Sequence, residues 1–166
     1  QEGADACLLM TPPYIKPTQE GLFQHYSAIA NEVPIPQILY NVPPRTAIDL
    51  LPETVERLSH IPNIVGIKEA LDDKERLAEL VSISQNIIDQ KHFSVFSGDD
   101  PTFNMFMANG GDGVISVAAN IIPKYIARIC SLNLGKQFNE AQELDFRFKN
   151  LYELLFIESN PMPVKW

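Results

Sequence analysis

Basic residues are scarce in this sequence, and long apolar runs are absent. Lysine and arginine number 13 against 21 acidic residues, which gives a formal charge of −8. Because nucleic-acid binding depends on clustered positive charge, this balance argues against a nucleic-acid partner. No apolar run approaches the roughly 20 residues that cross a bilayer, and the first residues lack a signal-peptide pattern. The sequence therefore predicts a cytoplasmic protein without membrane or nucleic-acid partners.

Cysteine and histidine are also few. The two cysteines, Cys7 and Cys130, lie in apolar surroundings, and we expect both to be reduced core residues rather than a disulfide framework. The three histidines, His25, His60 and His92, fall on predicted helices or helix-to-strand turns. A metal site needs clustered ligands, so we predict no metal.

Apolar runs and amphipathic segments alternate along the chain. The predicted strands are 6–10, 37–40, 64–67, 93–96 and 113–117, and the predicted helices are 20–33, 52–61, 74–89, 101–110 and 122–134. Nearly continuous apolar strands that alternate with helices indicate parallel strands covered on both faces. The fold class is therefore α/β.

The spacing of the strands favours a closed barrel. Strand ends fall near Met10, Tyr40, Lys68 and Phe96, about 30 residues apart, as in a (β/α)8 TIM barrel, although an open doubly wound sheet is also compatible. A complete barrel takes about 250 residues, so we expect only about five of its strands, in residues 1–135. Residues 136–166 would begin a C-terminal helical segment, with one long helix over 138–156.

Lys68 ends an otherwise apolar strand, "NIVGIKEA". The carboxyl ends of barrel strands carry the chemistry of such enzymes, and partial burial favours the neutral amine of a lysine. A neutral amine attacks a ketone to form a Schiff base, which then acts as an electron sink. The alternative is a strand-end lysine that reaches solvent or pairs with Glu69.

Tyr40 ends the preceding strand, in "YNVPPRT", so adjacent parallel strands would bring it beside Lys68. A phenol at this place can transfer protons; alternatively, it packs at the barrel rim. Arg45 lies five residues further on in what we expect to be a proline-stiffened loop. Its guanidinium suits a carboxylate, or it is a solvated loop residue.

Taken together, "ILYNVPPRT", "NIVGIKEA", "SGDD" and "NPMPVKW" resemble the dihydrodipicolinate synthase family of the N-acetylneuraminate lyase superfamily. The resemblance implies a class I aldolase-type lyase of lysine and diaminopimelate biosynthesis that condenses pyruvate with aspartate semialdehyde. It implies no cofactor. The expected assembly is a homo-oligomer, a dimer of dimers, and the chain would be an internal to C-terminal part of the enzyme.

The resemblance also implies roles for five residues. Lys68 would form the Schiff base, Tyr40 would transfer protons, and Arg45 would hold the carboxylate of aspartate semialdehyde. Tyr14 would reach into the site of a neighbouring subunit, and the backbone of Ile115 would touch pyruvate. Without the resemblance, Tyr14 is a surface aromatic and Ile115 a core residue.

Three functions stay open from the sequence. The first is the synthase, which Arg45 favours. The second is another class I pyruvate lyase of the superfamily, acting on N-acetylneuraminate or a keto-deoxy sugar acid through the same imine. The third is a non-catalytic half-barrel module, because a half barrel leaves sheet edges uncovered. The isolated chain is expected to be weakly active or inactive.

For "SGDD", residues 97–100, a helix N-cap competes with a substrate role.

Overall fold

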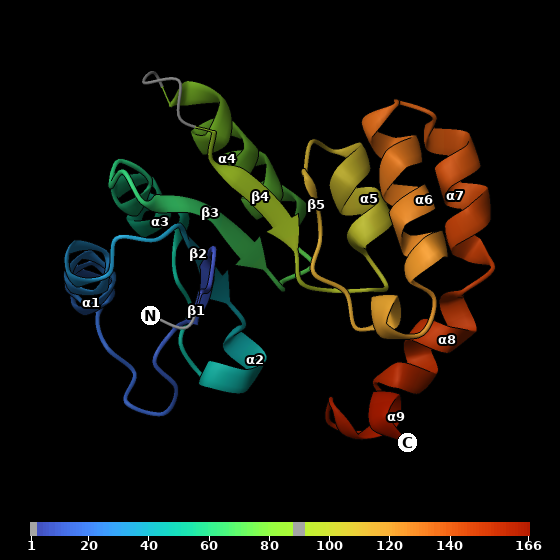
Figure 1. Cartoon of the computed structure of the whole chain (residues 1–166), viewed down its shortest axis with the longest axis horizontal. Coiled ribbons are helices and arrows are strands. Elements are labelled where there is room, and N and C mark those ends of the chain that lie inside the picture. The colour runs from blue at the N-terminus through green and yellow to red at the C-terminus, as the bar shows by residue number, and fades with distance from the viewer. Residues whose placement is uncertain (1–2, 88–91) are drawn as a thin grey trace. The chain divides into compact units, whose positions relative to one another are not determined.

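The computed structural model describes residues 3–87 and 92–166. Within these residues the strands are β1 (Cys7–Met10), β2 (Gln37–Asn41), β3 (Ile64–Glu69), β4 (Ser94–Ser97) and β5 (Gly113–Val114) (Figure 1). They form one sheet in the order β1-β2-β3-β4-β5. β1 pairs with β2, and β2 with β3, in parallel. Strands in sequence order with helices between them confirm the predicted α/β class.

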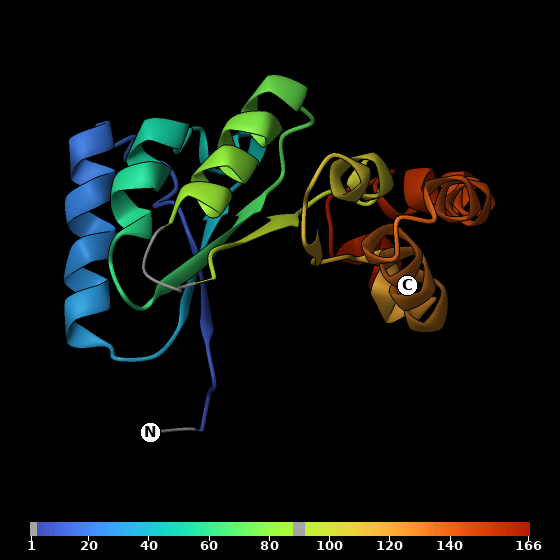
Figure 2. The same ribbon diagram turned by 90° about the horizontal axis from the view of Figure 1, so that it is seen from above.

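The chain divides into two compact units, residues 1–96 and 97–166, with the boundary before the last residue of β4. In the first unit, α1 (Gln19–Glu32), α3 (Pro52–Ser59) and α4 (Lys74–Asn86) lie in a row along one side of the strands (Figure 2). The short helix α2 (Pro43–Thr46) follows β2. The core of this unit is aliphatic and aromatic: Leu22, Tyr26, Leu39, Val55, Leu58, Ile64, Ile67 and Leu80 are buried.

Local signals explain where these helices begin. The Thr18 side chain accepts a hydrogen bond from the Gly21 amide at the start of α1, and the Asp73 carboxylate accepts from the first amides of α4. Pro52 occupies the first turn of α3, where its missing N–H costs nothing. The predicted helix over 74–89 ends at Asn86, and its last two predicted residues lie outside the described residues.

The second unit is helical around one core. It contains α5 (Phe103–Ala108), the 3-10 helix η1 (Ala118–Asn120), α6 (Pro123–Leu134), α7 (Phe138–Phe146), α8 (Lys149–Leu155) and α9 (Met162–Lys165). α5, α6 and α7 pack side by side (Figure 1). Their buried side chains include Phe103, Met107, Ile126, Ile129, Leu132 and Tyr152.

The prediction of one long helix over 138–156 is wrong, because the helix breaks at Arg147 and Phe148. The amides of these two residues bond to carbonyls three residues back, those of Leu144 and Asp145, which tightens the turn and ends α7. The break places the Tyr152 hydroxyl 3.0 Å from the Asp145 carboxylate. The apolar stripe alone could not reveal this buried polar contact.

Two further predictions differ in detail. The strand predicted over 113–117 ends at Val114, because the amides of Val117 and Ala118 donate to the Asp100 carboxylate and the chain turns into η1. Both cysteines are free, as expected, but they are only partly buried. Among the described residues, none of the helices has the length and apolarity needed to cross a membrane.

Asp145 makes the stability of the second unit depend on pH. Burial raises its pKa to about 6; the Tyr152 hydrogen bond and Lys149 act in the opposite direction, and nearby Asp100 adds to the increase. An unfolded carboxyl has a pKa of about 3.9, so the folded chain binds this proton more tightly. The contribution of Asp145 to stability is therefore fully present below about pH 4 and is lost as the pH rises through about 6.

We expect Asp145→Asn to remove this loss, because the amide oxygen still accepts from Tyr152 but carries no charge. The difference in free energy of unfolding between the variant and wild type should rise in favour of the variant by about 2–3 kcal/mol from pH 4 to pH 7.5. It is measured by thermal or denaturant unfolding at both pH values. Glu143→Gln, at an exposed position of the same helix, is the control. Parallel pH profiles for Asp145→Asn and wild type would contradict the expectation.

Candidate active site

The register of two parallel strands brings Tyr40 and Lys68 together. In the ladder between β2 and β3, Tyr40 is aligned with Lys68, and Asn41 with Glu69. Aligned residues of neighbouring strands project from the same face of a sheet. The Lys68 ammonium nitrogen lies 4.2 Å from the centroid of the Tyr40 ring, a cation–π contact. The structure therefore juxtaposes the two side chains that the sequence placed at neighbouring strand ends.

The rest of β3 explains how an ammonium comes to lie there. Ile64 and Ile67 are fully buried, whereas Lys68 is partly exposed at the end of the strand. Gly66 lets this strand approach β4 closely, because a Cβ atom at residue 66 would lie 2.6 Å from the carbonyl oxygen of Ser94. Lys68 thus lies at the partly exposed end of a tightly packed strand.

Charges around the Tyr40 phenol shape its acidity. Burial raises the pKa of Tyr40, the Glu69 carboxylate raises it further, and the Arg45 guanidinium partly offsets both. Burial and a nearby anion both disfavour the phenolate. The phenol is therefore neutral near physiological pH and is available as a proton donor to a group bound beside Lys68.

Arg45 lies in a helix rather than a loop, which corrects the prediction of an irregular proline-stiffened segment. Pro43 and Pro44 begin α2, and Ala47 ends it in the left-handed conformation. Proline is favoured at the first helical position because its fixed φ suits a helix and its missing N–H is not needed. The exposed Arg45 side chain is near enough to Tyr40 for its charge to act on the phenol.

Tyr14 lies in the loop between β1 and α1. Its side chain is 91% exposed, and its backbone has a φ of 74°, which is uncommon for a residue other than glycine. The Tyr14 amide donates to the Thr46 carbonyl oxygen at 3.3 Å, so the loop is attached to the end of α2. Its predicted role in a neighbouring subunit stays a prediction.

Ile115 belongs to the second unit. It directly follows β5 and is 37% exposed, and its amide donates to the Ser97 carbonyl oxygen at 3.0 Å. The isoleucine is therefore not a fully buried core residue, and its predicted contact with pyruvate stays a prediction.

The "SGDD" segment has a clear structural role. The Asp99 carboxylate accepts from the Thr102 hydroxyl at 2.7 Å. The Asp100 carboxylate accepts from the amides of Val117 and Ala118 at 3.0 and 2.9 Å. Asp100 therefore caps the start of η1, a more distant element than the helix α5 that follows it in sequence.

A buried polar network lies behind the Tyr40–Lys68 pair, and the sequence reasoning missed it. The Glu69 carboxylate accepts from the Arg76 Nε at 2.6 Å, from the Asn41 amide at 3.0 and 3.2 Å, and from the Leu71 amide at 2.9 Å. Burial raises the pKa of Glu69, while Arg76 and the other donors act to lower it. Strand alternation could have revealed this network. Asn41 and Glu69 each directly follow a predicted site residue, so they project from the opposite face of the sheet, which the helices cover.

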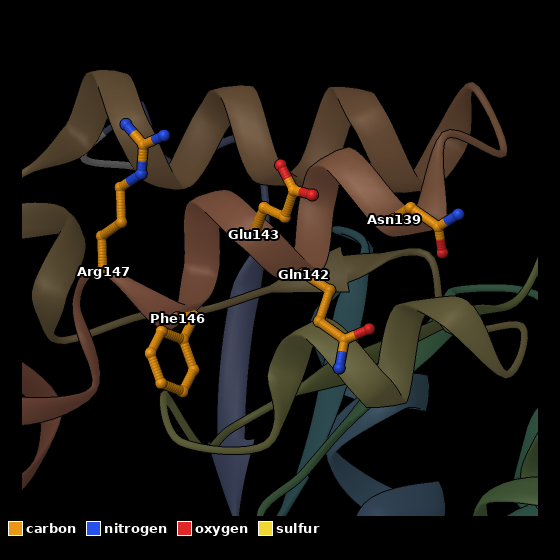
Figure 3. A pocket seen from close by; sticks show the side chains of 5 residues that line it. All are labelled: Asn139, Gln142, Glu143, Phe146 and Arg147. Atoms are coloured by element: carbon orange, nitrogen blue, oxygen red, sulfur yellow. The ribbon is translucent and has the colours of Figure 1, made fainter.

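A surface depression of about 520 Å³ lies elsewhere, on α7. Its lining residues, Asn139, Gln142, Glu143, Phe146 and Arg147, are all exposed, and their side chains spread outward from one helical stretch (Figure 3). It contains none of the predicted site residues and no buried polar group. Residues 3–87 and 92–166 contain no group of three or more His, Cys, Asp or Glu side chains arranged to hold a metal.

Comparison with known proteins assigns the family. The Dihydrodipicolinate synthetase family model matches residues 1–166. A 4-hydroxy-tetrahydrodipicolinate synthase of Teredinibacter turnerae is 54% identical over 166 residues, which is 100% of this chain and 55% of the relative. One of Pseudomonas aeruginosa is 52% identical over 164 residues, 99% of this chain and 54% of the relative. The chain belongs to the Dihydrodipicolinate synthetase family.

Solved structures agree with this assignment. A chloride-inhibited dihydrodipicolinate synthase of Acinetobacter baumannii, complexed with pyruvate, superposes with a TM-score of 0.92 at 51% identity and covers 99% of this chain and 55% of that one. A dihydrodipicolinate synthase of Thermotoga maritima gives 0.92 at 40% identity, over 98% of this chain and 55% of that one. The predicted fold, about five strands of a (β/α)8 barrel, is confirmed. The chain spans about half the length of the curated relatives it matches.

The charge arrangement predicts how the Tyr40 phenol responds to Arg45. Because the guanidinium lowers the pKa of Tyr40, Arg45→Ala should raise that pKa further, whereas Arg45→Lys, which keeps the charge, should change it less. The measurement is an NMR titration of ring-labelled tyrosine, with the Tyr40 signal assigned through Tyr40→Phe. An unchanged or lowered pKa in Arg45→Ala would show that the two groups are not coupled.

Proposed function

We propose that the protein containing this chain is a 4-hydroxy-tetrahydrodipicolinate synthase, a lyase that condenses pyruvate with aspartate semialdehyde in lysine and diaminopimelate biosynthesis. The observation that carries the proposal is the contact between the Lys68 ammonium and the Tyr40 ring, 4.2 Å apart on aligned strand ends. Membership of the family and the names of its relatives support the same reaction.

The proposed reaction begins at Lys68. Its neutral amine attacks the keto carbon of pyruvate; uptake of one proton, for which Tyr40 is the proposed donor, and loss of one water leave a protonated imine. The imine nitrogen withdraws electrons, so the methyl carbon loses a proton and becomes a nucleophile towards the aldehyde carbon of aspartate semialdehyde. The imine itself is the electron sink, so the proposed chemistry requires no cofactor and no metal.

Tyr40 is the proposed proton donor and acceptor. Its phenol is neutral at physiological pH, since burial and Glu69 raise its pKa, and it lies against the amine that would carry the intermediate. A positioned general acid or base contributes about 10²–10⁴ to a rate. Arg45 would bind the carboxylate of aspartate semialdehyde, because a guanidinium offers paired donors to a carboxylate.

The remaining assignments belong to the complete enzyme. We propose that Tyr14, with its exposed ring, enters the site of a neighbouring subunit in a homotetramer, a dimer of dimers, and that the Ile115 backbone contacts pyruvate. Residues 1–135 would be barrel and residues 136–166 the start of the C-terminal helical segment. The proposed location is the cytoplasm.

Borohydride trapping tests the covalent step. In the full-length protein, pyruvate followed by borohydride should reduce the imine and leave a stable adduct on the peptide that contains Lys68, detected by mass spectrometry. Lys68→Arg should give no adduct because a guanidinium does not form the imine, and Lys74→Arg, at the start of α4, should behave as wild type. An adduct at another lysine, or no adduct in wild type, would refute the proposed function.

A parallel substrate assay tests the second reactant. We expect turnover with aspartate semialdehyde and none with N-acetylneuraminate. Arg45→Ala should reduce kcat/KM for aspartate semialdehyde about tenfold to a hundredfold, in line with the loss of a charged hydrogen bond, while pyruvate trapping at Lys68 persists. Arg45→Lys should recover part of the loss. Preferential turnover of N-acetylneuraminate would instead identify a sugar-acid lyase of the same superfamily.

A further inference from the structure

The covered face of β2 and β3 carries a buried ion pair directly behind the candidate site. Glu69 is 1% exposed, Asn41 is fully buried and Arg76 is 8% exposed. Removing a carboxylate and a guanidinium from water costs several kcal/mol per ion unless each is paired and hydrogen-bonded. Because this cost offsets the attraction between the two charges, a buried ion pair adds little net stability to a fold. The position of this pair behind the candidate site therefore calls for another explanation.

The network connects the ends of both strands to the segments that follow them. Asn41 at the end of β2 donates to Glu69 at the end of β3 and to the Asp49 carboxylate at 2.8 Å. The Leu50 amide donates to the Asn41 side-chain oxygen at 2.9 Å. Arg76, on α4, binds Glu69, Asp49 and the Leu50 carbonyl oxygen. The two strand ends therefore have a shared set of partners.

Each strand-end member of the network is next in sequence to a predicted site residue. Asn41 follows Tyr40, and Glu69 follows Lys68. Successive side chains of a strand project from opposite faces, so a shift or rotation of the backbone that displaces Glu69 also displaces Lys68. Because the Glu69 carboxylate has partners on β2 and α4, movement at this point would break several buried contacts at once.

We infer that Glu69, held by Arg76 and Asn41, is a positioning residue that sets the approach of Lys68 to Tyr40 and acts electrostatically on the phenol through the sheet. The inference rests on the proposed function of these two residues. It assigns to Glu69 no contact with substrate.

The charges that face the phenol determine the expected sign. Lys68 on β3 contacts the ring, Arg45 on α2 favours the phenolate, and Glu69 disfavours it. Glu69 itself is faced by Arg76 on α4, with Asp49 on the far side of the guanidinium. Removing the negative charge of Glu69 should therefore lower the pKa of Tyr40.

The test uses Glu69→Gln in the full-length protein. Glutamine keeps an acceptor oxygen for Asn41 and the Leu71 amide but removes the charge. We expect the Tyr40 NMR titration, and the alkaline limb of the kcat profile that follows it, to move to lower pH. We also expect kcat to fall about tenfold to a hundredfold, as for a misplaced catalytic group, with KM for pyruvate changed by less.

A double variant separates positioning from folding. Glu69→Gln removes the more buried of the two carboxylates that pair with Arg76 and leaves only Asp49, which is destabilising for a buried guanidinium. Glu69→Gln/Arg76→Met should therefore recover thermal stability without restoring kcat or the Tyr40 titration. The control is Glu20→Gln, in the exposed Glu20–Arg57 pair of the same unit, where the charged atoms lie 2.9 Å apart. It should match wild type in all three measurements.

The inference is overturned if Glu69→Gln and the double variant keep the wild-type Tyr40 titration and kcat while only thermal stability changes. The NMR titration needs no turnover, so it reports the coupling of Glu69 to Tyr40 even if trapping with pyruvate fails. Absence of the Lys68 adduct in wild type would thus refute the proposed function alone, and an unmoved Tyr40 titration would refute the role of Glu69.

Discussion

The parallel register of β2 and β3 is the constraint on which the candidate site depends. The alignment of Tyr40 with Lys68 and of Asn41 with Glu69 places one pair at the partly open face and the other in the covered interior. A slip of one residue would exchange the two faces, burying the ammonium and exposing the carboxylate. The buried network therefore specifies the register as well as the position of the side chains.

Much of the fold followed from pattern because hydrophobic periodicity reports burial directly. The strands ending near Tyr40 and Lys68 and the helix predicted over 52–61 agree with prediction to within a few residues. The predictions that failed concern local backbone structure and polar contacts. The helix break at Arg147 depends on short-range hydrogen bonds of the backbone, the early end of β5 on the distant Asp100 carboxylate, and the one-turn helix that carries Arg45 on the proline conformation. Hydrophobic periodicity encodes none of these.

The candidate site was predictable to a similar degree. The meeting of Tyr40 and Lys68 followed from strand topology alone, since parallel neighbours bring their carboxyl ends together. The sequence offered Glu69 only as a partner of Lys68, and it gave no sign of the network with Asn41 and Arg76, because charged side chains suggest exposure whereas tertiary pairing buries these three. The distance between Lys68 and Tyr40, and the opposing influences of Arg45 and Glu69 on the phenol, required coordinates.

Gly66 has a consequence for how this protein can change. Its backbone passes so near the Ser94 carbonyl oxygen that even a methyl group would overlap it, and that neighbour is main chain, which cannot rotate away. Substitution in the middle of β3 is therefore restricted, whereas exposed positions such as Tyr14 and Arg45 face solvent and are free of this restriction. Sequence change can therefore accumulate at these exposed positions while the middle of β3 stays the same.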